Sequence, residues 1–263
     1  LIPISSDIAY RVNIFSPIIS ALTISLLFLI CNQFIDRVEP KDSNKFFKMW
    51  SSLTASLTFA FTHSHWFNAV ETEVYSFSGF MTALVIYLIM RWSEKMHNSD
   101  HVIYLIFISY LIGLATGLHL LNLLTIPFIG LIIYFSIGKI STKNLILTIT
   151  LSLISFFGIQ SFIIQGLPQI TASIGLIGLM LLIISLIAFT IYSIKSRKAF
   201  SSIFLSSTLL IIIGYSTYFS IFIRSGQDPN IDENNPETIA EAISYLNRDQ
   251  YGQMTILPRK FNS

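Results

Sequence analysis

Charged residues and cysteine are both scarce in this chain. Asp, Glu, Lys and Arg make up 11% of its 263 residues, whereas soluble globular domains carry about 25%. Hydrophobic residues make up 53%, and the mean hydropathy is +0.68, so the composition excludes an ordinary soluble domain. Cys31 is the single cysteine, which excludes an internal disulfide.

Long apolar runs fill most of the chain. A helix needs about 20 residues to cross a hydrocarbon core roughly 30 Å thick. The stretches that approach or exceed this length are 12–35, 47–65, 75–92, 102–118, 120–138, 144–165, 170–194 and 199–223. We expect Pro127 to kink the fifth of them. The sequence therefore predicts an all-α polytopic integral membrane protein with about eight transmembrane helices.

The cations lie in alternate connections between these runs. Eleven Lys and Arg residues lie in the loops at 36–48, 91–101, 139–143 and 195–198. None lies in the other loops, near 63–74, 119–122 and 166–169. Short cation-rich loops stay in the cytoplasm, so we expect the cation-free loops and both ends of the chain outside it. This topology accounts for the net charge of +2 without a nucleic-acid partner.

The sequence divides into a transmembrane part, 1–223, and an extracytoplasmic tail, 224–263. In the tail, Asn235 and Pro236 are typical of a helix N-cap and a first helical position. Apolar residues follow at helical spacing, at Ile239, Ile243 and Leu246. We expect a short amphipathic helix at about 236–248 that packs against the extracytoplasmic face or begins a soluble region.

Between the second and third runs, segment 61–79 concentrates polar and ionisable residues. Such groups are costly near lipid, so they usually face a cavity or a partner. His63 and His65 with Glu71 and Glu73 resemble metal ligands, but the pattern lacks a clear third ligand, and we predict no metal. Glu73 is the better candidate for contacting a substrate, the alternative being a structural carboxylate. Glu71 is more typical of a solvated loop acid.

Further polar and aromatic residues have two interpretations each. Trp66 and Tyr75 are typical of interfacial aromatics, although Trp66 is also able to stack on a sugar. His119 and Asn122 lie where two apolar runs meet, where polar side chains either bond neighbouring helices or face a substrate cavity. Arg224 follows the last run and either anchors to lipid headgroups or pairs with a lipid-linked phosphate.

Several motifs occur in one order along the chain. They are Arg11-Val-Asn-Ile-Phe-Ser, Trp66-Phe-Asn-Ala-Val-Glu-Thr-Glu-Val-Tyr, Gly117-Leu-His-Leu-Leu-Asn, Arg224-Ser-Gly-Gln-Asp-Pro and Tyr245-Leu-Asn-Arg. Together they resemble a bacterial, mainly Bacteroidetes-type, family of multi-span proteins long known only as a domain of unknown function. That family is similar to a eukaryotic transmembrane protein O-mannosyltransferase that modifies plexin-type domains. Both resemble GT-C glycosyltransferases.

This resemblance implies a membrane glycosyltransferase. It would transfer a sugar from a polyprenyl-phosphate carrier to an extracytoplasmic acceptor, either a protein hydroxyl or a glycan, without a cofactor. It places the enzyme in the bacterial inner membrane, with the active face and the tail in the periplasm. The residues in or beside the motifs that we expect to bind substrate are His65, Trp66, Asn68, Glu71, Tyr75, His119, Asn122 and Arg224.

One feature of the family is missing from this sequence. GT-C enzymes have an essential acidic residue on the first extracytoplasmic loop, and the surroundings of Asp7 do not match it. We therefore expect that a span and a loop precede Leu1, that the principal acidic base lies there, and that the chain alone is inactive. Glu73 is the candidate catalytic residue within the chain. The alternative is a transporter or a non-catalytic assembly factor, but a transporter should have ionisable residues deep within paired spans.

Overall fold

The computed structural model describes residues 5–38, 44–98, 100–137 and 140–247, together with Asp249 and Gly252. Every regular element in these residues is helical. The α-helices are α1 (Ile8–Asn13), α2 (Phe15–Val38), α3 (Lys45–Ala60), α4 (His63–Val70), α5 (Val74–Lys95), α6 (His101–Thr116), α7 (Thr125–Ile137), α8 (Thr142–Gly158), α9 (Gly166–Lys195), α10 (Ala199–Tyr215), α11 (Ser220–Ser225) and α12 (Ile239–Asn247). Shorter elements join some of them: the 3-10 helices η1 (Leu120–Leu124) and η3 (Ser216–Phe219) and the π-helix η2 (Ile159–Ile164).

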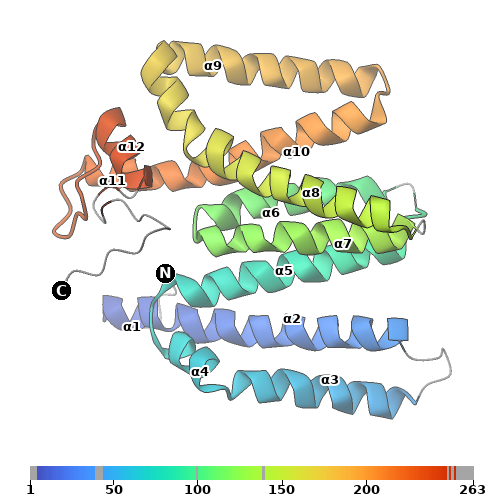
Figure 1. Ribbon diagram of the computed structural model, residues 1–263. Helices are drawn as coiled ribbons and strands as arrows, with labels where there is room; N and C mark the ends of the chain where they lie inside the picture. The colour runs from blue at the N-terminus through green and yellow to red at the C-terminus, as the bar shows by residue number, and fades with distance from the viewer. Residues whose placement is uncertain are drawn as a thin grey trace, which may run out of the picture.

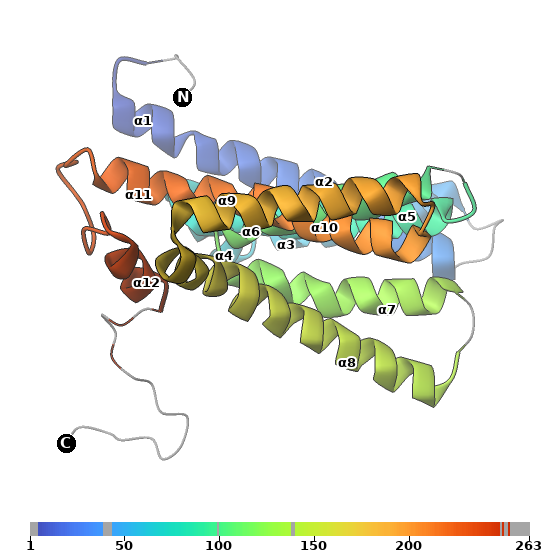
Figure 2. The ribbon, with the colours of Figure 1, turned by 90° about the horizontal axis from the view of Figure 1, so that it is seen from above.

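The long helices lie side by side and run in alternating directions (Figure 1). Contacts pair α2 with α3 and α5, α5 with α6 and α7, α7 with α8, and α10 with α6 and α9. The helix ends that flank the cation-bearing connections lie together, on the right of Figures 1 and 2. The helices α1, α4, α11 and α12 lie at the opposite end. The cation-bearing and cation-free connections therefore lie at opposite ends of the bundle, as the alternation predicted.

Several helical stretches are long and apolar enough to cross a membrane. There are five in the described residues: Ile8–Val38, Val74–Lys95, Leu120–Ile137, Thr142–Lys195 and Ala199–Ser225. The most apolar window of Thr142–Lys195 has a mean hydropathy of 2.8, yet only 6% of it is buried within the protein. Apolar side chains that face outward over such a length are stable in lipid. The fold is that of a membrane protein; α3 and α6, with 16 residues each, are shorter than the predicted spans.

The connection between α8 and α10 differs from the predicted loop near 166–169. No loop forms at 166–169, because these residues begin α9. Instead, α9 bends at Gly175, whose φ of 71° lies in the left-handed region that glycine adopts without a steric cost. The first turns of α9 connect α8 to a long second part, which runs back beside α10 (Figure 1).

The segment between α3 and α5 also differs from the prediction of one helix over 47–65 and a loop over 63–74. The first helix ends at Ala60, and α4 begins at His63. Thr62 causes this break: its backbone is extended, and its Oγ1 accepts a hydrogen bond from the His65 backbone N–H at 3.4 Å. That is the geometry of an N-cap, which starts a new helix.

Pro127 was expected to kink this run, but it lies in the first turn of α7. A backbone N–H is not needed there, so the proline is accommodated without a kink in α7.

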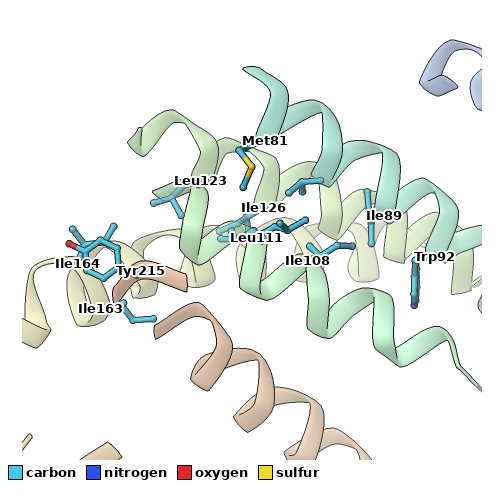
Figure 3. Close-up of a cluster of buried hydrophobic side chains, with 13 residues drawn as sticks. Met81, Ile89, Trp92, Ile108, Leu111, Leu123, Ile126, Ile163, Ile164 and Tyr215 are labelled. Atoms are coloured by element: carbon cyan, nitrogen blue, oxygen red, sulfur yellow. The ribbon is translucent and has the colours of Figure 1, made fainter. Parts of the chain in front are cut away.

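The core lies where α5 meets α6 (Figure 3). Met81, Ile89 and Trp92 line one face of α5, and Ile108 and Leu111 face them from α6.

Next to this core, α6 and α10 pack closely. A Cβ atom added at Gly113 of α6 would collide with the carbonyl oxygen of Ile211 in α10. Glycine therefore permits the close approach of the two helices.

The C-terminal helix α12 begins at Ile239, later than the predicted start at about 236, and the predicted end at 248 lies outside the described residues. Asn235 does not cap it; Thr238 does. The Thr238 N–H donates to Glu241 Oε2 at 2.8 Å, and the Glu241 N–H donates to Thr238 Oγ1 at 3.3 Å. This capping box was readable in the sequence as Thr-Ile-Ala-Glu. The helix packs against α9 at the end of the bundle opposite the cation-bearing connections, as Figure 1 shows.

Candidate functional site

A groove of about 520 Å³ lies between α2, α4 and α5, with Phe59 of α3 and Phe128 of α7 completing its walls. One end is polar, and its lining residues there are Ser64, His65, Asn68, Tyr75 and Ser76. The remainder is largely apolar, and its residues include Leu27, Ile30, Phe34, Ala83 and Ile86. No Asp, Glu, Lys or Arg is among the described residues that line it. The groove therefore suits a long apolar molecule with one polar end.

Two serines hold α4 against its neighbours. Ser20 Oγ of α2 donates a hydrogen bond to Ser76 Oγ of α5 at 3.2 Å. Ser76 Oγ in turn donates to the carbonyl oxygen of Asn68 in α4 at 2.5 Å. This chain of bonds joins three helices at the polar end, so the position of Asn68 is set by elements that are distant in sequence.

His65 lines the groove and is half-buried. Its ring lies against Phe59, with 4.8 Å between the ring centroids. Burial lowers the pKa of the imidazole, an effect that a backbone hydrogen bond with Ser20 partly offsets. The lowered pKa favours the neutral imidazole, whose one N–H is used in the bond with Ser20 and whose other nitrogen is able to accept a hydrogen bond.

The two glutamates lie just outside the groove. Glu71 follows the last residue of α4, and Glu73 precedes the first residue of α5. Both side chains are exposed, so burial does not distinguish them. Glu73 makes no capping hydrogen bond to α5 and lies two residues before Tyr75, whose side chain lines the groove.

Two other predicted substrate-binding residues are not among the residues that line the groove. Trp66 is 56% exposed, and its ring stacks on Phe61 with 5.8 Å between centroids. Arg224 is exposed in α11 and is not among the residues that line the groove. Both positions fit side chains at a membrane surface.

Tyr75 links the groove to His119. Their ring centroids lie 5.5 Å apart. His119 Nδ1 accepts a hydrogen bond from the Leu121 N–H at 3.2 Å and so caps η1, which replaces the predicted loop at 119–122. His119 is half-buried and lines a second cavity at the same end of the bundle.

Asn122 is only 2% exposed, and its hydrogen-bonding capacity is used within the protein. Its Nδ2 donates to Ser78 Oγ at 3.1 Å and to the carbonyl oxygens of Ala115 and His119, both at 2.9 Å. Its Oδ1 accepts from Thr82 Oγ1 at 2.8 Å. These contacts fit the interpretation in which Asn122 bonds neighbouring helices; its role in substrate binding stays a prediction.

The histidines of the His-x-His pattern have aromatic neighbours. His63 stacks on Phe67 with 6.1 Å between ring centroids, and His65 lies against Phe59. Within the part of the chain that the structure describes, His, Cys, Asp and Glu form no group of three or more that could hold a metal ion.

Sequence reasoning missed the residues that α2 contributes to the site. Ser16, Ser20 and Thr23 are buried and follow one another at helical spacing. Small polar residues at this spacing mark close packing between membrane helices, and this signal could have predicted the contact of α2 with α5.

The sequence model described as "Protein O-mannosyl-transferase TMEM260 N-terminal domain" matches residues 1–143, more than half of the chain. The chain belongs to this family. The O-mannosyltransferase match contains α1 to α7 and therefore every element that lines the groove. No curated protein and no solved structure matched the chain.

Proposed function

We propose that this protein is a GT-C-like membrane glycosyltransferase that takes a sugar from a polyprenyl-phosphate carrier and transfers it to a hydroxyl group of an extracytoplasmic protein or glycan. The observation that supports the proposal is the groove, because its polar end and apolar body match a phosphate on an isoprenoid chain. Membership of the O-mannosyltransferase family supports the same chemistry.

The groove would hold the isoprenoid chain between α2 and α5, with the phosphate at its polar end. There, Ser64, His65, Asn68 and Tyr75 offer neutral hydrogen-bonding groups. A neutral site is appropriate because the phosphate stays at the water-facing end and need not be desolvated. A transporter would instead need ionisable groups deep within its spans, and no Asp, Glu, Lys or Arg is among the described residues that line the groove.

The proposed reaction is a displacement at the anomeric carbon of the sugar. The acceptor oxygen forms the new bond to this carbon while the bond from the carbon to the carrier's phosphate oxygen breaks, and an acidic base takes the acceptor proton. Glu73 is proposed to bind a donor or acceptor hydroxyl at the mouth of the groove. Its exposed carboxylate has no capping bond to give up.

The proposed location is a bacterial inner membrane. The cation-bearing connections would face the cytoplasm, and α4, α11 and α12 would face the periplasm.

Glycine provides a way to test the groove. Gly79 lines it, and a Cβ atom added there meets nothing within 4 Å, so Gly79→Leu places a side chain in the groove without a backbone clash. Gly158 is the matched control, because its added Cβ also meets nothing within 4 Å and it lines a separate hollow along α8 and η2 instead of the groove.

The experiment uses a polyprenyl phosphate with a photoreactive isoprenoid and the protein in nanodiscs. We expect labelling of α2 and α5, at least about tenfold weaker in Gly79→Leu and unchanged in Gly158→Leu, since a filled site excludes the chain. Competition by polyprenyl phosphate but not by polyprenol would show that the phosphate is recognised. Labelling spread evenly over α3, α8 and α9, and equal in both variants, would contradict the proposal.

A further inference from the structure

A second cavity lies at the same end of the bundle as the polar end of the groove, and its volume is about 270 Å³. It is bounded by the end of α6, by η1, by the junction of α10 with η3, and by α12. This volume is slightly below the range of about 300–1,000 Å³ that is typical of pockets for drug-sized ligands. The cavity therefore suits one small molecule rather than a lipid chain or an extended peptide.

Aromatic rings dominate the lining. Tyr215, Tyr218 and Tyr245 all contribute to it. The rings of Tyr215 and Tyr218 stack with 5.5 Å between centroids and 14° between planes. No Asp, Glu, Lys or Arg is among the described residues that line the cavity. A ligand that fits is therefore neutral and has both apolar faces for the rings and polar groups at its edge.

Tyr215, His119 and Thr116 have hydrogen-bonding capacity left for a ligand. Tyr215 is 2% exposed, and its hydroxyl has no hydrogen-bond partner among the described residues, which is costly for a buried polar group. Because His119 Nδ1 accepts from Leu121, the neutral ring has its proton on Nε2 and is able to donate from there. Thr116 Oγ1 donates to the carbonyl oxygen of Ile112 at 2.7 Å and is still able to accept.

From these groups we propose that the second cavity is a binding site for a neutral sugar unit. A sugar ring offers C–H faces to the tyrosine rings and hydroxyls to Tyr215, His119 and Thr116. The rings of His119 and Tyr75 lie 5.5 Å apart, and Tyr75 lines the groove, so the two sites meet at this pair. The sugar is either that of the lipid-linked donor or part of an acceptor glycan, and this assignment rests on the proposed function.

The C-terminal part of the chain completes the site. Tyr245 and Leu246 enter the lining from α12, and Tyr245 also contacts Phe222 of α11, with 6.4 Å between ring centroids. Residues 215–246 lie outside the family match at 1–143. The sugar site thus combines a wall from the matched part with a wall from a part that the family model does not cover.

Binding of free sugars tests the site without requiring transfer. The protein in nanodiscs is titrated with the methyl glycosides of mannose, glucose and galactose, and binding is followed by saturation-transfer NMR. We expect saturable binding of at least one glycoside. Tyr215→Phe, which removes only the hydroxyl, should weaken it by about threefold to tenfold. Tyr245→Ala, which removes a ring from the wall, should weaken it at least as much.

Tyr192→Phe is the matched control, because Tyr192 is exposed on α9, where Lys198 lies over its ring, and does not line the cavity. It should bind the glycoside like the wild type. The proposal is overturned if no glycoside binds saturably, or if Tyr215→Phe and Tyr245→Ala bind like the control.

Gly79→Leu distinguishes this site from the groove. Sugar binding that Tyr215→Phe weakens, without specific carrier labelling of the groove, would remove the proposed function and leave the sugar site. Carrier labelling without sugar binding would leave the proposed function and remove the sugar site. A polyprenyl-linked hexose that displaces the methyl glycoside from the wild type, but not from Gly79→Leu, would identify the sugar as that of the donor. A soluble oligosaccharide that displaces it from both would identify an acceptor glycan.

Discussion

Replacing Asn122 with leucine removes the side chain that joins α5, α6 and η1. Leucine keeps a similar size but neither donates nor accepts a hydrogen bond. The bonds that cross between these elements end at Ser78 Oγ and Thr82 Oγ1 in α5 and at the carbonyl oxygen of Ala115 in α6. If these bonds hold the helices together, Asn122→Leu should lower the free energy of unfolding.

The size of the loss follows from the number of bonds. Hydrogen bonds between membrane helices contribute about 0.6 kcal/mol each on average, so three of them contribute about 2 kcal/mol. With the value of about 1 kcal/mol that is typical of protein hydrogen bonds, the sum is about 3 kcal/mol. The Ala115 carbonyl oxygen keeps two other donors, the backbone N–H groups of Leu118 and His119, so its share is small. We therefore expect a loss of about 2 kcal/mol, most of it from the hydroxyls of Ser78 and Thr82.

The assay is reversible unfolding in mixed micelles, driven by SDS and followed by circular dichroism. Asn32→Leu is the matched control, because among the described residues the Asn32 amide donates to the Phe28 carbonyl oxygen, one turn earlier in the same helix, at 3.0 Å. It should change the free energy of unfolding little. Asn122→Leu combined with Ser78→Ala and Thr82→Val should recover part of the loss, because the unpaired hydroxyls are then absent.

Two results would refute this reasoning. An equal effect of Asn122→Leu and Asn32→Leu would show that the bonds between the helices contribute nothing measurable. Failure of the triple variant to recover would show that the loss comes from the shape of leucine in the core and not from unpaired polar groups.

Three further predictions concern Glu73, the membrane topology and α12. In the full-length protein, Glu73→Gln should lower sugar transfer by about 5- to 150-fold, because it leaves unpaired substrate hydrogen bonds worth about 1–3 kcal/mol, whereas Glu71→Gln should stay near wild type at matched expression. An impermeant thiol reagent should label a cysteine at Ser64 in intact cells but not one at Ser196. Hydrogen bonds from Thr238 lower the pKa of Glu241 below its ordinary value of 4.5. These bonds therefore stabilise α12 fully at a pH above 4.5, and the stabilisation is lost as the pH falls through the lowered pKa. Amide exchange in α12 should then accelerate.

Each of these predictions has an outcome that contradicts it. Near-wild-type transfer by both glutamine variants would remove the segment from the active site, and a larger loss at Glu71 would reverse the assignment. Labelling at Ser196 but not at Ser64 would invert the topology. Protection of the α12 amides that does not change as the pH falls would show that the Glu241 bonds do not hold this helix.

The long helices were predictable because lipid imposes a simple requirement. A chain that crosses a membrane must bond its backbone internally, so runs of apolar residues become helices whatever their detailed order. The breaks were harder to predict. Gly175 lies within the long hydrophobic stretch 170–194, where a glycine alone does not mark a turn, and its positive φ shows the bend.

The start of α4 has a signal in the sequence. Thr62 before His63 is an N-cap signal, but the polar composition of the segment outweighed it and suggested a loop.

The groove was not predictable from one sequence. It joins residues of α2, α4 and α5 with Phe128 of α7, and their proximity depends on which helices are neighbours.

The two faces of α5 show how packing supports the proposed chemistry. Tyr75, Gly79 and Ile86 lie on the face that lines the groove. Met81 and Ile89 lie on another face, in the core with α6. Because the second face is close-packed, it fixes the rotation and height of α5 and so the position of the first face. Substitutions on the core face should therefore change stability first, whereas Gly79→Leu should change ligand binding while the fold is retained.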